Sequence, residues 1–291
     1  MAQPVVTAPA GELPRVDFAQ LEPVEDEAAV IAVTMQKGGV GKTETTKGLG
    51  DKLSRRVKPN GKKVRVLYVD FDPNGTLSDG VGVSEDLAAT GLASVLLEKD
   101  GAAPVTELVY AVTEDLHILP ARLDLFKLKS ELVGMRGRER RLWLALQPLL
   151  HYYDAILIDC EPDLGSGTDN AIYAAAKRKR GGVLVVVMLD GPSMRCFETL
   201  LDQIESLEMT LDVRVPLMGW FANQATDTKV AKKYRAEFEA MPLPKLGEMP
   251  VRSKIKEAWD ADMLLTDYAS PVYDANYVYD ELAKKVWEMI A

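Results

Sequence analysis

The chain has 291 residues, with 44 acidic and 35 basic side chains, a net charge of −9 and a pI near 5.0. Hydrophobic residues make up 47%, which excludes an intrinsically disordered or fibrous chain. No apolar run approaches the roughly 18 residues of a membrane-spanning helix. The first ten residues lack the basic and apolar regions of a secretory signal, and two cysteines cannot form a disulfide scaffold. We therefore expect a soluble, globular, cytoplasmic protein. Its negative net charge argues against binding of nucleic acid over the whole protein surface, although a local basic patch could still bind it.

Residues 1–28 carry six acidic side chains against one arginine and show no periodicity, which predicts a flexible acidic tail. Residues 29–291 show neither an internal repeat nor a second domain boundary. Short apolar runs predict strands at 29–34, 64–70, 116–120, 155–159, 183–189 and 215–223. Helical patterns lie at 43–56, 123–150, 194–206, 228–240 and 273–290. This alternation predicts a three-layer α/β fold, in which a twisted, mostly parallel sheet has helices on both faces.

A glycine-rich segment, QKGGVGKT at 36–43, lies between the first predicted strand and the first predicted helix. It departs from the ordinary phosphate-binding pattern GxxxxGK[ST], because Gln36 replaces the first glycine, but it fits the deviant form KGGxGK[ST]. Such a loop can surround phosphate oxygens with backbone N–H groups, and the helix N-terminus adds partial positive charge. We expect Lys42 to reach the β- and γ-phosphates and the Thr43 hydroxyl to take a Mg²⁺ position. The alternative is a glycine-rich turn capped by Thr43.

The loop resembles that of the ParA/MinD family of P-loop ATPases, whose members dimerise around two nucleotides. The resemblance implies the P-loop NTPase fold for residues 29–291, with ATP and Mg²⁺ as cofactors. It also implies that Lys37 reaches across an ATP-dependent homodimer to the partner's phosphates, beside the catalytic Lys42. The nucleotide contacts that it implies in the loop are Gly38, Gly39, Val40, Gly41, Lys42, Thr43 and Glu44.

Two further segments extend the resemblance in the expected order. Asp70 lies 28 residues after Lys42 and begins the sequence DFDPNG, which is similar to the family's DxDPQG switch with Asn74 in place of Gln. The resemblance assigns Asp72 to the attacking water and Asp70 to the Mg²⁺ water shell, although a turn alone would explain residues 72–75. Asp159, 87 residues after Asp72, ends an apolar run that matches the Walker B strand and implies a further Mg²⁺ ligand.

The C-terminal part contains three weaker matches. Residues 219–223 are similar to the strand whose last residue, here Asn223, contacts adenine in the family, and a simple strand-end hydrogen bonder is an equal alternative. Residues 249–258, which include the implied nucleotide contact Pro250, are similar to an IPRxxxxxEA segment. Residues 266–271 are similar to an xxYAP element.

The resemblance is greatest to ParA-type partition ATPases, which bind DNA non-specifically as ATP dimers and are stimulated by a ParB-like adaptor. It therefore implies slow intrinsic hydrolysis and association with the nucleoid. The candidate DNA contacts are Arg252, Lys254 and Lys256 in the IPR-like segment, and Lys229, Lys232 and Lys233 on one face of a predicted helix. For the helix, a solvated charged face is the alternative.

A second group of cations is expected at the amino-terminal edge of the sheet, opposite the nucleotide. It comprises residues 177–180 together with Arg55, Arg56, Lys58, Lys62 and Lys63. These side chains form either a second basic surface or a solubilising one. We expect the acidic tail to compete with DNA for a basic patch.

Two other functions remain possible on this fold. One is a MinD-like positioning ATPase acting on a membrane or protein scaffold, but the nearly balanced charge of residues 280–291 favours a helix packed on the sheet, and we expect no membrane partner. The other is a metabolic ligase, which the leading lysine and the DxDP switch disfavour. Electron transfer through a metal cluster would need cluster cysteines, whereas Cys160 and Cys196 are interpreted as structural thiols.

Overall fold

The computed structural model describes residues 13–83, 91–99, 101–121, 125–163, 165–269 and 273–291. Within these ranges eight strands form one sheet in the order β3-β4-β2-β5-β1-β6-β7-β8. All neighbouring strands are parallel except β3 and β4, which are antiparallel. The strands are β1 (Ala29–Thr34), β2 (Val66–Phe71), β3 (Tyr110–Ala111), β4 (Leu116–Leu119), β5 (Ala155–Cys160), β6 (Gly181–Val187), β7 (Leu217–Ala225) and β8 (Lys245–Pro250).

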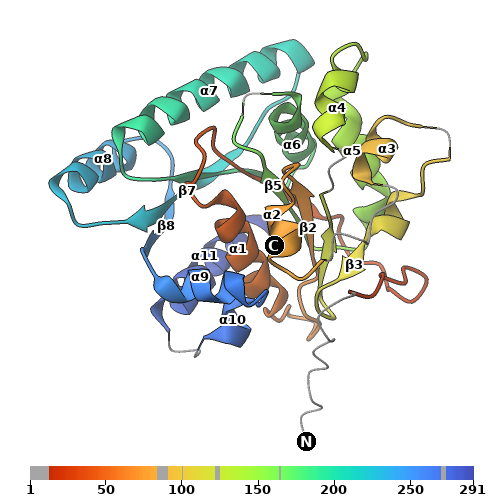
Figure 1. Cartoon of the computed structure of the whole chain (residues 1–291), viewed down its shortest axis with the longest axis horizontal. Helices are drawn as coiled ribbons and strands as arrows, with labels where there is room; N and C mark the ends of the chain where they lie inside the picture. The colour runs from red at the N-terminus through yellow and green to blue at the C-terminus, as the bar shows by residue number, and fades with distance from the viewer. Residues whose placement is uncertain (1–12, 84–90, 100, 122–124, 164, 270–272) are drawn as a thin grey trace, which may run out of the picture.

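Helices cover both faces of the sheet, as predicted (Figure 1). Helices α6 and α7 lie on one face, and α1 and α11 lie on the other. The α-helices are α1 (Lys42–Ser54), α2 (Thr76–Asp79), α3 (Leu92–Leu96), α4 (Leu125–Leu132), α5 (Arg141–Leu146), α6 (Ser166–Ala176), α7 (Gly191–Leu211), α8 (Lys229–Glu239), α9 (Ser253–Asp260), α10 (Leu265–Tyr268) and α11 (Asp274–Ile290). Short 3₁₀ turns lie at Val105–Leu108, Arg138–Arg140 and Gln147–Leu149.

The central strands explain why the sequence specifies this fold. Every residue of β1, β2 and β5 is buried, and these strands consist almost entirely of apolar residues. A parallel strand with helices on both faces requires such a continuous apolar run, because neither face meets water. The polar exceptions in β2 and β5 are Asp70 and Asp159, which lie near the carboxyl ends of these strands.

The predicted helix at 123–150 is wrong in its continuity. Its described part is divided into α4, α5 and two 3₁₀ turns. Gly137 adopts a left-handed conformation with φ of 64°, and Pro148 lies in the last 3₁₀ turn, so neither residue favours an uninterrupted helix. Residues 123 and 124 lie outside the described residues.

The amino-terminal residues 13–28 also differ from the expected flexible tail. They lie against the domain, with Ala28 fully buried and Leu13, Val16 and Phe18 packed on the core. The backbone N–H of Val24 donates to the carbonyl of His151 at 2.8 Å. Residues 1–12 of the predicted tail lie outside the described residues.

Helix α11 packs as predicted. Its apolar face, including Tyr279, Leu282 and Val286, is buried, and the helix contacts α1 and β8. Among the described residues, no helix is long and apolar enough to cross a membrane. Cys160 is buried and Cys196 is partly buried, and both are free thiols.

A buried histidine beside the amino-terminal segment makes the stability depend on pH. His117 in β4 is 3% exposed, its Nδ1 lies 2.8 Å from the Tyr153 hydroxyl, and burial lowers its pKa from 6.5 to about 4. The folded state favours the neutral ring, so this stabilisation is present above pH 6.5 and is lost as the pH falls towards 4. The loss corresponds to at most about 3 kcal/mol.

We expect His117→Gln to reduce this pH dependence of the free energy of unfolding. Urea denaturation between pH 4.5 and 7.5 measures it, and His151→Gln, which changes an exposed histidine, serves as the control. Identical pH slopes for the wild type and the His117 variant would contradict the assignment.

Candidate nucleotide site

The glycine-rich loop connects β1 to α1 at the carboxyl end of the central strand. Gly39 and Gly41 have φ of 72° and 89°, a conformation that side chains with a Cβ rarely adopt. A Cβ on Gly38 or Gly39 would meet no atom within 4 Å, so these two residues face open space. The loop therefore presents accessible backbone beside the N-terminus of a 13-residue helix, as phosphate binding requires.

Two side-chain amides near the carboxyl end of β7 support the other side of the loop. Asn223 Nδ2 donates to the carbonyl of Val40 at 3.1 Å, and Gln224 Nε2 donates to that of Gly39 at 2.9 Å. Asn223 thus acts as the strand-end hydrogen bonder, and its contact with adenine stays a prediction. Gln224 was not anticipated. Its backbone is left-handed, with φ of 51°, which no pattern in the sequence indicates.

The two lysines of the loop lie in different surroundings. Lys42 is buried, and within the described part of the chain the one hydrogen-bond contact of its amine is with the carbonyl of Lys37 at 3.5 Å. Burial lowers the pKa of Lys42, while the charge of Asp159 opposes this shift. Lys37 is instead partly buried, and its amine contacts Asp190 at 2.6 Å and Ser193 at 3.3 Å. The ion pair between Lys37 and Asp190, at the N-terminus of α7, was not predicted.

The two strand-end carboxylates lie side by side, because Asp70 of β2 is in register with Asp159 of β5. Burial raises the pKa of Asp70 to about 6, although Asp70 accepts hydrogen bonds from the Ser78 N–H and hydroxyl at 2.8 and 2.7 Å. Burial, reinforced by the charge of Asp70, also raises the pKa of Asp159. One oxygen of Asp159 contacts the Thr46 hydroxyl at 3.3 Å, and among the described residues the other has no hydrogen-bond partner of good geometry, while a hydrogen bond from Thr43 opposes the rise in the pKa of this carboxyl.

The second carboxylate of the switch, Asp72, is partly exposed. Its Oδ1 accepts from the backbone N–H and the side-chain amide of Asn74 at 3.0 and 2.8 Å. This local hydrogen bonding is the turn that the sequence DPNG permits. Asn74 therefore orients Asp72, and the role of Asp72 towards water stays a prediction.

These groups fit a nucleotide with a divalent cation. Lys42 makes one weak hydrogen-bond contact and Asp159 has one oxygen without a hydrogen-bond partner among the described residues, and their opposite charges compensate each other only in part, since burial still shifts both pKa values. Phosphate oxygens would satisfy the first and Mg²⁺ the second. Within the described ranges, no group of three or more His, Cys, Asp or Glu side chains is arranged to hold a metal by itself.

The side chain of Glu44 is engaged away from the loop. Its carboxylate accepts hydrogen bonds from the Trp259 indole and from the Tyr279 hydroxyl at 3.1 Å, and burial raises its pKa to about 7. The amine of Lys47 lies 4.0 Å from the centre of the Trp259 ring. The predicted nucleotide contact of Glu44 can therefore involve only its backbone. Pro250 ends β8 and pairs with Ala225 of β7, and its nucleotide contact also stays a prediction.

The candidate DNA residues fall into two groups. Lys229, Lys232 and Lys233 are exposed on α8, as their spacing predicted. In the second group, Arg252 forms an ion pair with Asp274, Lys254 lies 3.5 Å from Glu257, and Lys256 is exposed. Among the described residues, neither group contacts the phosphate loop. The role of both groups in DNA binding stays a prediction.

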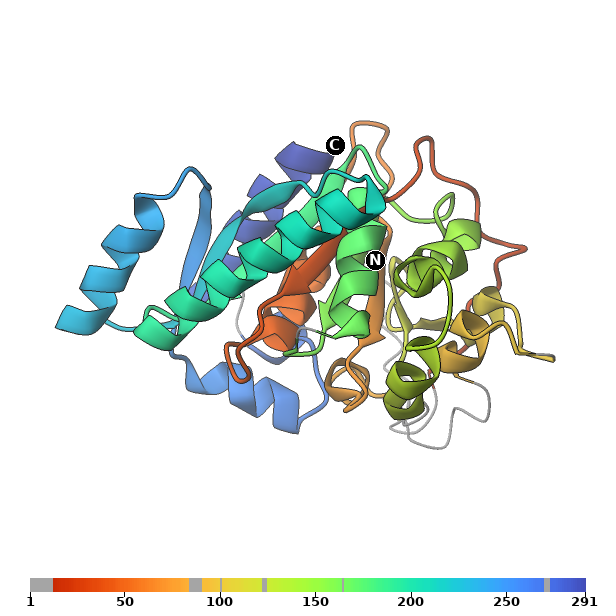
Figure 2. The same cartoon turned by 90° about the horizontal axis from the view of Figure 1, so that it is seen from above.

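Four of the cations expected at the opposite edge of the sheet come together, whereas Arg55 and Arg56 pair elsewhere, with Asp51 and Asp280. Lys58, Lys62, Lys63 and Arg180 line one cavity there. In Figure 2 the loop after α1 and the end of α11 lie at this edge, and the phosphate loop lies at the other. These cations are extensively paired, for example Lys58 with Asp154 at 2.9 Å, so they do not form an open basic surface.

The fold and the glycine-rich loop define the class of P-loop nucleoside triphosphatases. Similarity to known proteins identifies the family within this class. A family model described as an AAA domain matches residues 28–216. The chromosome partitioning protein ParA of Caulobacter vibrioides is 33% identical over 217 residues, which cover 72% of this chain and 76% of ParA. The chain spans 57% of the length of two relatives from Mycobacterium tuberculosis, to which it is 34% identical over 66% of its own length.

Solved structures agree on the fold. A variant of Cyanothece McdA in complex with ATP has a TM-score of 0.78 at 19% identity, over 90% of this chain and 97% of McdA. Cobyrinic acid a,c-diamide synthase from Mycobacterium smegmatis, with an ATP analogue and magnesium, has a TM-score of 0.70 at 27% identity. The match covers 88% of this chain and 93% of the synthase. The chain belongs to the ParA family of P-loop ATPases.

Gly41 offers a test of the loop geometry. A Cβ at this position would lie 1.8 Å from Asn223 Nδ2 and would require an unfavourable φ. We expect Gly41→Ala to weaken binding of a fluorescent ATP analogue more than tenfold. The control is Gly61→Ala, where φ is also positive (80°) but the Cβ meets open space. Equal affinities for the two variants would contradict this account of the loop.

Proposed function

We propose that the protein is a Mg²⁺-dependent ATPase that forms a dimer around two ATP molecules and binds DNA non-specifically in that state. A ParB-like DNA-bound adaptor stimulates its slow hydrolysis and resets it, so that a plasmid or chromosome is segregated. The ATP dimer is associated with the nucleoid. Support comes from the phosphate loop and from relatives named as partitioning proteins.

The observation that carries the proposal is the different environment of the two loop lysines. Lys42 is buried inside its own loop, where it can contact only a nucleotide bound to the same chain. Lys37 is held at the surface by Asp190, and its side chain is 22% exposed. To contact the phosphates of a second chain, Lys37 exchanges Asp190 and Ser193 for those phosphates. A second chain then completes the site.

The remaining residues take roles that follow from their positions. ATP and Mg²⁺, when bound, supply the phosphoanhydride and the charge neutralisation that phosphoryl transfer needs. The loop N–H groups and Lys42 bind the phosphates, Thr43 and Asp159 hold the cation, and Asp70 contacts its water shell. Asp70 positions the switch through Ser78, and Asp72 orients the attacking water.

DNA is the proposed second ligand because exposed lysines lie on α8 and α9. Their contacts would go to phosphates, which gives sequence-independent and salt-sensitive affinity. The alternative is a positioning ATPase on a membrane or protein scaffold. The apolar face of α11 is already covered by α1 and β8, which favours DNA over a membrane anchored through this helix.

Two substitutions separate binding from hydrolysis. Lys42→Ala should abolish ATP binding, because it removes the cation buried beside the phosphates. Asp72→Ala should retain binding but lower hydrolysis by about 100-fold or more, so that the ATP dimer accumulates. Light scattering with ATP and phosphate release measure the two effects. Normal hydrolysis by the Asp72 variant would overturn its assignment.

DNA binding is tested by a mobility shift on random-sequence duplex with ATP, ADP or no nucleotide, across a salt series. We expect retention with ATP alone and a steep loss as salt rises. Arg252→Ala should weaken binding on all sequences and lower the salt slope by about 1. Lys127→Ala, which removes an exposed charge on α4, is the matched control. Absence of binding under every condition would favour the scaffold alternative and leave the ATPase assignment intact.

A further inference from the structure

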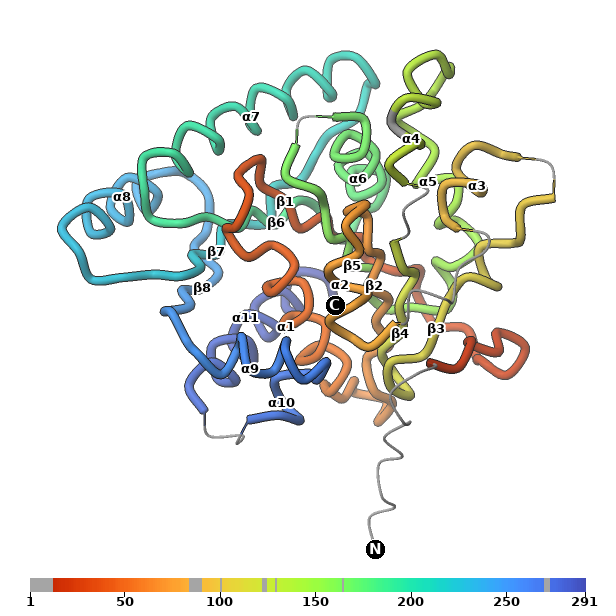
Figure 3. The backbone as a smooth tube through the Cα atoms, in the orientation of Figure 1, coloured from red at the N-terminus to blue at the C-terminus, as the bar shows by residue number. Residues whose placement is uncertain are grey.

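The amino-terminal segment, residues 13–27, extends the sheet at its outer edge. Val16 N–H donates to the carbonyl of Val109 at 3.0 Å, and Ala111 N–H donates to that of Pro14 at 2.8 Å. Arg15 thereby forms an antiparallel bridge with Tyr110 of β3. Figure 3 shows this part of the trace beside β3. An edge strand offers unpaired backbone groups that any extended peptide can use.

An aromatic anchor follows the strand pairing. The ring of Phe18 meets that of Tyr152 edge-on with centroids 5.0 Å apart, and that of Tyr153 at 6.4 Å. Phe18 is only partly buried. The anchor is therefore shallow.

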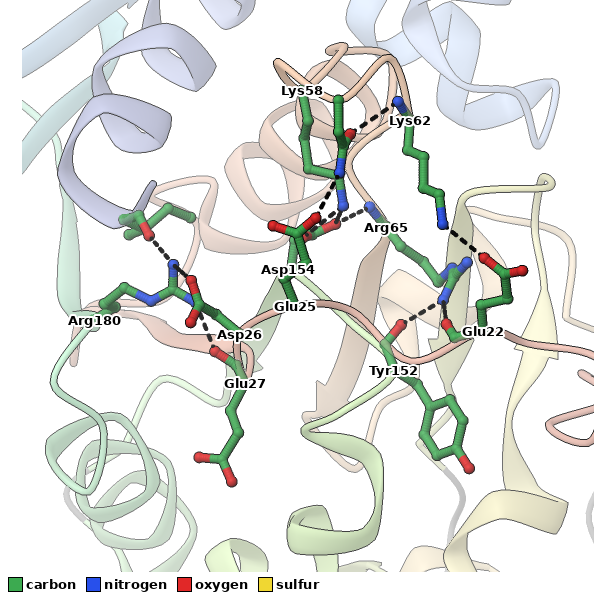
Figure 4. A network of polar contacts seen from close by, with 12 residues as sticks. Glu22, Glu25, Asp26, Glu27, Lys58, Lys62, Arg65, Tyr152, Asp154 and Arg180 are labelled. Carbon is green, nitrogen blue, oxygen red and sulfur yellow. Dashed lines mark hydrogen bonds and ion pairs between the residues drawn. The ribbon is translucent and has the colours of Figure 1, made fainter.

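The acidic half of the segment lies on the amino-edge surface, which we define as Lys58, Lys62, Lys63, Arg65, Arg178 and Arg180. Figure 4 shows Lys58, Lys62, Arg65 and Arg180 of this surface. Glu22 contacts Lys62 at 2.6 Å, and this hydrogen bond lowers the pKa of Glu22. Glu27 pairs with Arg178, and Asp26 lies 3.6 Å from Arg180.

The arginines of this surface also bind the peptide backbone of the segment. Arg65 donates to the carbonyl of Glu22 at 2.9 Å, and Arg180 donates to the carbonyl of Glu27 at 2.8 Å. The surface therefore binds both backbone carbonyls and carboxylates, which are the two kinds of acceptor that an acidic peptide presents.

The charges around the segment also distinguish a peptide from a nucleic acid. A cavity of about 780 Å³ lies between the segment and the domain. Five cations line it, against three carboxylates of the domain, namely Glu114, Asp115 and Asp154. These carboxylates would repel a continuous row of phosphates but leave separate cations for the spaced carboxylates of a peptide.

We propose that the amino-edge surface and β3 form a docking site for an extended acidic peptide of a partner protein, and that residues 13–27 occupy this site in the free chain. The partner peptide pairs with β3, places an aromatic or apolar side chain against Tyr152, and directs carboxylates to Lys62, Arg178 and Arg180. The site lies at the opposite edge of the sheet from the phosphate loop and is independent of the proposed ATPase function.

The segment is suited to exchange. Glu22 and Lys62 are 76% and 62% exposed, and such surface pairs contribute little individually. Its apolar residues Leu13, Val16 and Phe18 are only partly buried. A competing peptide must nevertheless overcome the high effective concentration of a tethered segment.

The test uses the full chain without nucleotide and a fluorescein-labelled peptide with the sequence of residues 13–27. We expect the variant Glu22→Gln/Asp26→Asn/Glu27→Gln to bind this peptide at least tenfold more tightly than the wild type, because its own segment competes less well. Fluorescence anisotropy measures the affinity, which should fall as salt rises.

Three controls assign the effect. Glu198→Gln/Asp202→Asn/Glu205→Gln makes the same charge change on the exposed side of α7 and should behave as the wild type. Adding Lys62→Gln to the segment variant should lower its affinity for the labelled peptide again. Circular dichroism shows whether each variant is folded.

Two results would overturn the proposal. One is a folded segment variant that binds the peptide no better than the wild type. The other is a random-sequence duplex that binds the segment variant more tightly than the peptide does and displaces it, because the surface would then be a nucleic-acid site.

Discussion

The parallel register of β2 and β5 places two buried carboxylates, Asp70 and Asp159, next to each other, and the arrangement of the site depends on this pair. Two like charges in a buried position cannot both remain ionised without compensation. Ser78 compensates Asp70 from the first turn of α2, which ties the switch to the strand. Asp159 keeps one oxygen without a partner, so the site needs a cation. Lys42 and a divalent ion are the available candidates, and the glycine-rich loop brings phosphates to the same place.

Helix α1 transmits this arrangement to the C-terminal part of the chain. Its first turn carries Lys42 towards the loop and Glu44 away from it, so that one turn contacts both the nucleotide site and Trp259 of α9. The Trp259 ring also packs closely against Gly80, because a Cβ placed on Gly80 would lie 1.7 Å from Cζ3 of this ring. Thus α9, which carries candidate DNA-binding lysines, packs against both α1 and Gly80, the residue that follows α2. A segment far from the phosphate loop in the sequence therefore contacts the helix that begins at this loop.

The sequence was sufficient to predict an element of the fold where the local residue pattern matches the burial of that element. The apolar runs of β1, β2 and β5 predicted buried parallel strands, and the glycines and terminal aspartates predicted the site between them. Strand β8 was missed because only two of its six residues are buried and it contains glycine and proline. Helix α6 was missed because its SGTDNAIYAAA sequence is rich in small residues. The amino-terminal segment was interpreted as a tail because its stabilising contacts involve residues far away in the chain, such as Lys62 and Arg178, and no local periodicity records such contacts.

The location of the amino-terminal segment has a consequence for assembly. If two chains join through the carboxyl edges of their sheets, their amino edges point away from each other, at the two ends of the dimer. A partner with one acidic peptide can then bind either end without disturbing the joint. A partner with two such peptides gains avidity only if its linker spans the whole dimer. A partner whose linker is long enough to span the dimer would therefore bind the dimer more tightly than the single chain, whereas a partner with a short linker would bind both equally.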